Sequence, residues 1–123
     1  MDNKEKATIE QEQEPVHNGG ITAEQIELWR AKHRKVYQID VDDDGEVFTA
    51  YFRRPDNETL AATTSLAQRD PYKAMSVLFE NCWLGGDPLI KDDAVLRMAA
   101  TQKLDGLVAS VVANLKNLSG LTR

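Results

Sequence analysis

The residues best able to do chemistry form the acidic run from Asp40 to Glu46, DVDDDGE. Carboxylates at loop positions 1, 3 and 5 followed by glycine at position 6 make the first half of an EF-hand calcium loop. The second half does not follow, because position 9 is Phe48 and position 12, which needs a bidentate glutamate, is Tyr51. Asp-Gly also supplies the positive φ angles of a tight hairpin turn. We therefore expect a hairpin tip with solvated carboxylates, with weak cation binding as the alternative.

The single cysteine, Cys82, is the second candidate for chemistry. A nucleophilic thiol needs a nearby base and electropositive surroundings. The chain has only two histidines, His17 and His33, and Cys82 follows an apolar helical pattern. The pattern favours a small buried hydrophobe. One cysteine excludes an internal disulfide and is typical of a reducing compartment.

A basic cluster, RAKHRK, runs from Arg30 to Lys35 around His33. It offers charge for a phosphate or an acidic partner. Basic residues in the last turn of a helix also complement the helix dipole, and this is the interpretation we favour.

Asp70 and the pair Asp92-Asp93 directly precede expected helices, so helix capping explains them without catalysis. The sequence contains no phosphate-binding loop, dinucleotide fingerprint, zinc spacing or serine elbow. We expect no catalytic, cofactor-binding or metal-ligating residues, and no enzymatic activity.

The composition is that of one small acidic domain. The 123 residues carry 20 Asp and Glu against 15 Lys and Arg, a net charge of −5. This balance argues against a protein that coats nucleic acid, whose phosphates call for a basic face. Residues 1–20 have no apolar core of a secretory signal, and no apolar run approaches the roughly 20 residues of a membrane span. We expect a soluble cytoplasmic protein.

Residues 1–20 are polar and charged and end in Asn18-Gly19-Gly20, so we expect a flexible tail. Residues 21–123 should form a single α+β domain. Thr22 and Gln25 have the spacing of a capping box at the start of a helix, which would place Ile26, Trp29 and His33 on one stripe beside Leu28. Alternating β-branched and aromatic residues at 36–41 and 47–52 then predict a β-hairpin around the acidic turn.

About three helices should follow the hairpin. Asp56 caps the first, which should reach about Gln68. Asp70-Pro71 is a second start, and Gly85-Gly86 ends that helix before a turn at Asp87-Pro88. The last helix should run from about Asp92 or Asp93 to about Leu118, giving a mostly helical α+β fold. The second of these helices has one apolar face, formed by Met75, Leu78, Phe79 and Cys82.

The last helix has an apolar stripe with alternating steps of four and three residues. A stripe with this spacing packs either on its own domain or on another subunit. Two flanking residues, Leu107 and Val112, widen the stripe and favour self-association. The stripe consists of Leu104, Val108, Val111, Leu115 and Leu118.

Two motifs connect these elements to a known family. The second strand of the hairpin ends in an aromatic-Arg-x-Pro motif at Phe52 to Pro55 and leads into a helix. A later helix ends in the corner NCWLGGD at Asn81 to Asp87. With the order of the elements, these motifs resemble the tail assembly chaperones of long-tailed bacteriophages and prophages, over about residues 21 to 118.

The resemblance implies a non-enzymatic protein of the bacterial host cytoplasm that binds the tape-measure protein and recruits tail-tube subunits. Such chaperones leave the finished particle, often self-associate, and are in some cases made in two lengths by frameshifting. A capsid- or tail-associated structural virion protein is the alternative, and a cation-regulated module that uses Asp40 to Asp44 is a third. The expected protein-binding residues are apolar: Trp29, Trp83, Leu104, Val108, Val111, Leu115 and Leu118.

Overall fold

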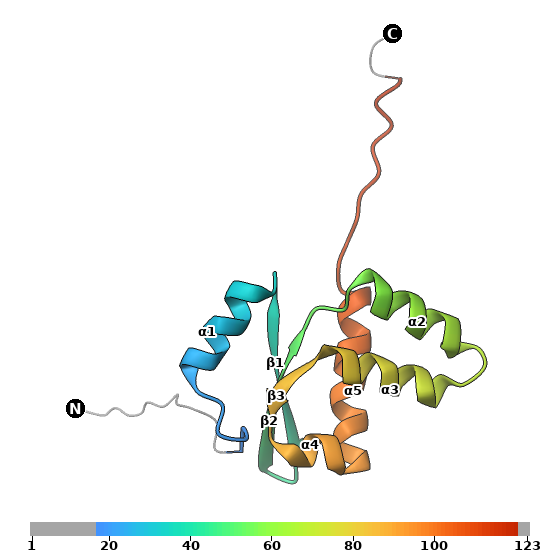
Figure 1. Ribbon diagram of the computed structural model, residues 1–123. Coiled ribbons are helices and arrows are strands. Elements are labelled where there is room, and N and C mark those ends of the chain that lie inside the picture. Colours follow the sequence, from blue (N-terminus) through green and yellow to red (C-terminus); the bar gives the residue numbers. More distant parts are fainter. Residues whose placement is uncertain (1–16, 121–123) are drawn as a thin grey trace.

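The computed structural model describes residues 17–120 (Figure 1). Residues 1–16, most of the predicted flexible tail, lie outside the described residues. The α+β prediction is confirmed, and more residues lie in helices than in strands. The elements are α1 (Ala23–Lys32), β1 (Val36–Asp43), β2 (Glu46–Arg53), α2 (Asn57–Ala67), α3 (Pro71–Cys82), β3 (Trp83–Gly86), α4 (Pro88–Asp92) and α5 (Ala94–Ala109).

Polar side chains set the helix starts, as the sequence predicts. Thr22 and Gln25 form a capping box at α1, in which each side chain accepts the backbone N–H of the other residue. Asp56, Asp70 and Asp93 each accept a backbone N–H from the first turn of α2, α3 and α5. These carboxylates therefore stabilise helix ends.

The acidic run turns the hairpin. β1 and β2 pair antiparallel, and Asp43 faces Glu46 at the last step of the ladder. Between them Asp44 has φ 56° and Gly45 has φ 92°, as a tight hairpin turn requires. The carboxylate of Asp42 accepts the N–H of Gly45 at 2.8 Å. The predicted hairpin tip is confirmed.

A third strand, β3, was not predicted. The sequence predicts a helix that ends at Gly85-Gly86, in a corner at Asn81 to Asp87. Instead, residues 83–86 pair antiparallel with β2, so the strand order is β1-β2-β3. The helix α3 ends at Cys82, before the glycine pair that was expected to stop it, and Gly85 and Gly86 lie within β3. Gly86 has φ 150°, and a Cβ added there would lie 2.4 Å from the Cα of Ala50. The glycine pair was predicted to end the helix, but in the structure it lies in β3, where Gly86 allows the close approach to β2.

The central strand β2 is covered on both faces. Phe48, Ala50 and Phe52 lie in the main core, while Thr49 and Tyr51 are buried on the opposite face. Figure 1 shows α1 on one side of the sheet and α2 to α5 on the other. The main core consists of Ile39, Val41, Phe48, Ala50, Phe52, Leu78, Phe79, Cys82, Ile90, Leu96, Ala100 and Leu104.

The first helix lies on the sheet through part of the predicted stripe. Ile26, Trp29 and His33 are half-buried. Leu28, which was placed beside this stripe, is 70% exposed and points away from the sheet. The helix therefore contacts the sheet along a narrow strip.

Residues 17–20 belong to the domain and not to the predicted tail. His17 forms a parallel bridge with Phe48, and its carbonyl accepts the N–H of Thr49 at 2.8 Å. Asn18 is buried and donates to the carbonyl of Ile21 at 2.9 Å and to the Tyr51 hydroxyl at 3.4 Å. Gly19, with φ 71°, turns the chain from this contact into α1. Within the described residues, tertiary contacts are therefore already present at His17, before the predicted start of the domain at Ile21.

The C-terminal part differs most from the prediction. A short helix, α4, occupies the expected turn after Asp87. The long helix begins after its cap, Asp93, as predicted, but it ends at Ala109 and not near Leu118. Ser110 donates its N–H and its hydroxyl to the carbonyl of Leu107, at 3.1 and 2.7 Å. Such a local bond competes with continued helix, and the β-branched pair Val111-Val112 that follows favours helix weakly.

Candidate protein-binding surface

The predicted apolar stripe is divided by the end of α5. Leu104 is 1% exposed and belongs to the core, whereas Leu115 is 98% exposed. We call residues 108–118 the apolar arm. In Figure 1 the chain after α5 leaves the body of the domain as an extended segment. A continuous heptad stripe is therefore wrong, because its C-terminal members are not helical. The exposed large apolar residues of the arm are Val108, Val111, Val112, Leu115 and Leu118.

The root of the arm borders a small hollow of about 220 Å³. Leu107, Val108 and Val111 form one wall, and Arg54, Pro55 and Leu60 form the other. Beyond Val111 every arm residue is exposed. Full burial of one leucine or valine side chain is worth about 1.5–3 kcal/mol, so a partner that covers the arm would gain substantially.

The two candidate tryptophans pack inside their own domain. Trp29 lies 5.8 Å from Tyr51, between ring centroids, and its indole covers Gly85. Trp83 lies 5.6 Å from Phe52 and 5.4 Å from Phe79. These contacts assign both rings to packing, whereas the arm gathers five of the exposed large apolar residues in one short segment.

The basic cluster at the end of α1 lies beside a second pair of basic residues that is distant from it in the sequence. Lys32 and Lys35 lie beside Arg53 and Arg54, which follow from the end of β2. Only Arg30 and Lys32 occupy the last turn of α1, so the helix dipole does not explain the residues after it. We call this feature the basic hollow, a surface depression of about 420 Å³. It is lined by Lys32, His33, Arg34, Lys35, Arg53, Arg54, Pro55 and Asp56.

One cation of the basic hollow is already paired. Arg53 lies 3.4 Å from the carboxylate of Asp56. The pKa of that carboxyl is lowered, first by the hydrogen bonds from Thr59 and then by Arg53. Within residues 17–120, no carboxylate lies within 4.0 Å of the other Lys and Arg side chains of the hollow. The described part of the chain therefore supplies no carboxylate that neutralises these charges.

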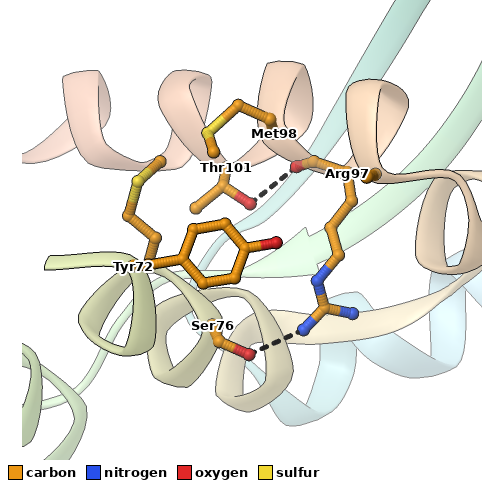
Figure 2. Close-up of a pocket in the computed structure, with 7 residues that line it drawn as sticks. Tyr72, Ser76, Arg97, Met98 and Thr101 are labelled. Carbon is orange, nitrogen blue, oxygen red and sulfur yellow. Dashed lines mark hydrogen bonds between the residues drawn. The ribbon is translucent and has the colours of Figure 1, made fainter. Parts of the chain in front are cut away.

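A third hollow, of about 260 Å³, lies between α3 and α5 (Figure 2). Arg97 crosses it and donates to the hydroxyl of Ser76 at 2.9 Å and to Glu80 at 3.0 Å. The arginine also lies 4.3 Å over the ring of Phe79, so its charge serves the packing of the two helices. The remaining lining includes Tyr72, Met98 and Met75, of which only Met75 belongs to the predicted apolar face of α3.

The other residues with possible chemistry have structural surroundings. Cys82 is fully buried, and burial raises the pKa of its thiol from 9.0 to about 11, which agrees with the predicted buried hydrophobe. The carboxylate of Asp40 accepts the hydroxyl of Thr49 at 2.7 Å. Among residues 17–120, no three His, Cys, Asp or Glu side chains are grouped to hold a metal ion. No helix in this part of the chain is long and apolar enough to cross a membrane.

Comparison with known proteins supports a shared fold with a solved structure and indicates no function. No protein-family model and no curated protein matches the sequence. A solved structure of an uncharacterised protein from Bacillus stearothermophilus is similar, with a TM-score of 0.52 and 20% identity. The match covers 75% of this chain and 99% of that one. At this level of identity, the similarity shows a shared fold alone.

Proposed function

We propose that this chain is a non-enzymatic assembly factor, a tail assembly chaperone of a phage or prophage. In this role it binds the tape-measure protein in the host cytoplasm and recruits tail-tube subunits. The observation that carries the proposal is the apolar arm, whose Leu115 is 98% exposed.

The apolar arm suits a helical client. In a helix, Val108, Val111, Leu115 and Leu118 would share one face, because their spacing follows the helical repeat. An isolated helix of this length is marginal in water, so partner contacts would have to stabilise it. The arm would then fold on binding and cover apolar residues of the client.

The surroundings of the polar residues also support a binding role. Asp56, Asp70 and Asp93 cap helices, and Cys82 is a buried thiol with a raised pKa. The three aspartates and the cysteine thus have structural roles, and for this reason we place the function in the apolar arm.

A genetic experiment tests the proposal. Genes for a tape-measure protein and a tail-tube protein should flank the gene for this chain. Deleting the gene should leave heads without long tails, and the wild-type gene should restore them. The variant L115D/L118D should not restore tails, whereas N114D, which adds a charge to the arm but removes no apolar group, should restore them. Normal tails in the deletion strain would refute the proposal.

A structural virion protein is the second candidate, because an exposed apolar arm also suits a permanent contact with a neighbouring subunit. Mass spectrometry of purified particles separates the two. A chaperone is absent from the mature particle, and a virion protein is present in a constant ratio to the tail-tube or capsid subunit.

A further inference from the structure

The hairpin carries opposite charge at its two ends. Lys35, Arg53 and Arg54 lie where the hairpin joins the rest of the domain, and the turn at its far end is acidic. The strands are eight residues long, which corresponds to about 25 Å. Figure 1 shows the turn and the end of α1 at opposite ends of the hairpin. We call the far end the acidic tip: Asp42, Asp43, Asp44 and Glu46.

We propose that the acidic tip of one copy of this chain docks in the basic hollow of a second copy. The tip is narrow, because only Asp44 and Gly45 connect the two strands. All of its carboxylates are exposed, and the hollow offers Lys32, Arg34, Lys35 and Arg54 to meet them. The two surfaces are complementary in charge.

Local contacts leave much of this charge uncompensated. At the tip, Asp42 holds the turn through the Gly45 N–H, and Glu46 lies 3.2 Å from His17. Within residues 17–120, no basic side chain lies within 4.0 Å of the carboxylates of Asp43 or Asp44. The carboxylates of Asp43 and Asp44 are therefore the ones that we expect to pair with the basic residues of the hollow.

The contact has to form between two molecules. The tip and the hollow belong to opposite ends of one paired hairpin, so a chain cannot place its own tip in its own hollow. A nucleic acid fits less well, because the whole chain carries a net charge of −5 and would repel a polyanion. A second copy carries the matching acidic surface in a defined shape.

The geometry of the assembly follows from the two different surfaces. A contact between unlike surfaces is heterologous, so repeated docking generates a ring or an open chain of copies. The apolar arm takes no part in this contact. The inference is therefore independent of the proposed function.

Sedimentation velocity of the full chain tests the contact. Association should increase with protein concentration in about 20 mM salt and disappear in about 500 mM salt, because screening shortens the range of the interaction. R34E/K35E and D43K/E46K should each weaken association in low salt by about tenfold or more. All variants should keep the thermal unfolding temperature of wild type, since the substituted residues are exposed.

Mixing the two charge-reversed variants gives the decisive result. An equimolar mixture should associate again, since each reversed surface then meets its complement, and one chain with all four substitutions should also associate. Two results would overturn the inference: association of wild type that neither reversal changes, or a wild type that stays monomeric in low salt. A monomer that binds poly-glutamate or duplex DNA through Arg34 and Lys35 would assign the hollow to another acidic partner instead.

Discussion

At the scale of single residues, Gly86 packs against the backbone of β2 with no room for a side chain. A Cβ at Gly86 would lie 2.4 Å from the Cα of Ala50 and 2.7 Å from the carbonyl oxygen of Thr49. Neither backbone atom can move without disturbing the ladder. Gly86 also has φ 150°, a conformation that other residues rarely adopt. Glycine is therefore required here for two separate reasons.

Gly86→Ala should lower the free energy of unfolding by about 3 kcal/mol or more, because it combines a backbone clash with an unfavourable φ. Gly106→Ala is the matched control, since Gly106 lies in α5 with open space around it. This control should raise stability by about 0.5–1 kcal/mol, the difference in helix propensity. Urea denaturation measures both, and equal effects of the two substitutions would contradict the account.

Cys82 gives a prediction about pH. Burial raises the pKa of its thiol to about 11, so the folded state holds the proton more tightly than the unfolded chain does. The protonated thiol contributes fully to the free energy of unfolding below about pH 9. This contribution is lost as the pH rises from about 9 to 11. At pH 8 the thiolate fraction should be about 100-fold lower in the folded state. Iodoacetamide should therefore label the native protein at least that much more slowly than the unfolded protein, and similar rates would contradict the burial.

Residue-scale features were predictable where the cause is local. Asp56, Asp70 and Asp93 cap helices through hydrogen bonds within one turn, so the sequence alone reveals them. The approach of Gly86 to Ala50 joins residues 36 positions apart, and no short pattern encodes it.

At the scale of elements, the end of α5 determines which apolar residues are core. Leu104 lies within the helix and is 1% exposed, whereas Leu115 lies in the apolar arm and is 98% exposed. The sequence presents both as members of one stripe. Only the position of the helix end separates them.

The same substitution at these two positions should give opposite results. Leu104→Asp should cost about 4 kcal/mol or more and unfold the domain, because it buries an unpaired charge. Leu115→Asp should change the free energy of unfolding by less than about 0.5 kcal/mol. Circular dichroism with thermal denaturation distinguishes them. Loss of fold in Leu115→Asp would mean that the arm packs on the domain.

The elements that the sequence did not reveal depend on tertiary contacts. β3 is four residues long and contains two glycines, so its strand character comes from pairing with β2. The helix α5 ends where the Ser110 hydroxyl donates a hydrogen bond to the carbonyl of Leu107. Such side-chain bonds compete with the backbone bonds of a helix, and the apolar stripe does not reveal this competition. The basic hollow likewise requires the ends of α1 and β2 to meet.

At the scale of the whole molecule, two candidate binding surfaces adjoin each other. Arg54 and Pro55 line both the basic hollow and the hollow at the root of the apolar arm. The acidic tip lies at the other end of the hairpin. A copy that docks its tip in the hollow would therefore approach the arm of its neighbour, and assembly and client binding could influence each other.

The most direct test of the central claim is co-purification from cells that express the full chain together with the tape-measure protein that the proposed function requires as its client. We predict that wild type and N114D keep this client in the soluble fraction and purify with it, while L115D/L118D, though folded, does not. If L115D/L118D retained the client as well as wild type, the apolar arm would not be the binding element. The proposed function would then lose the observation on which it rests.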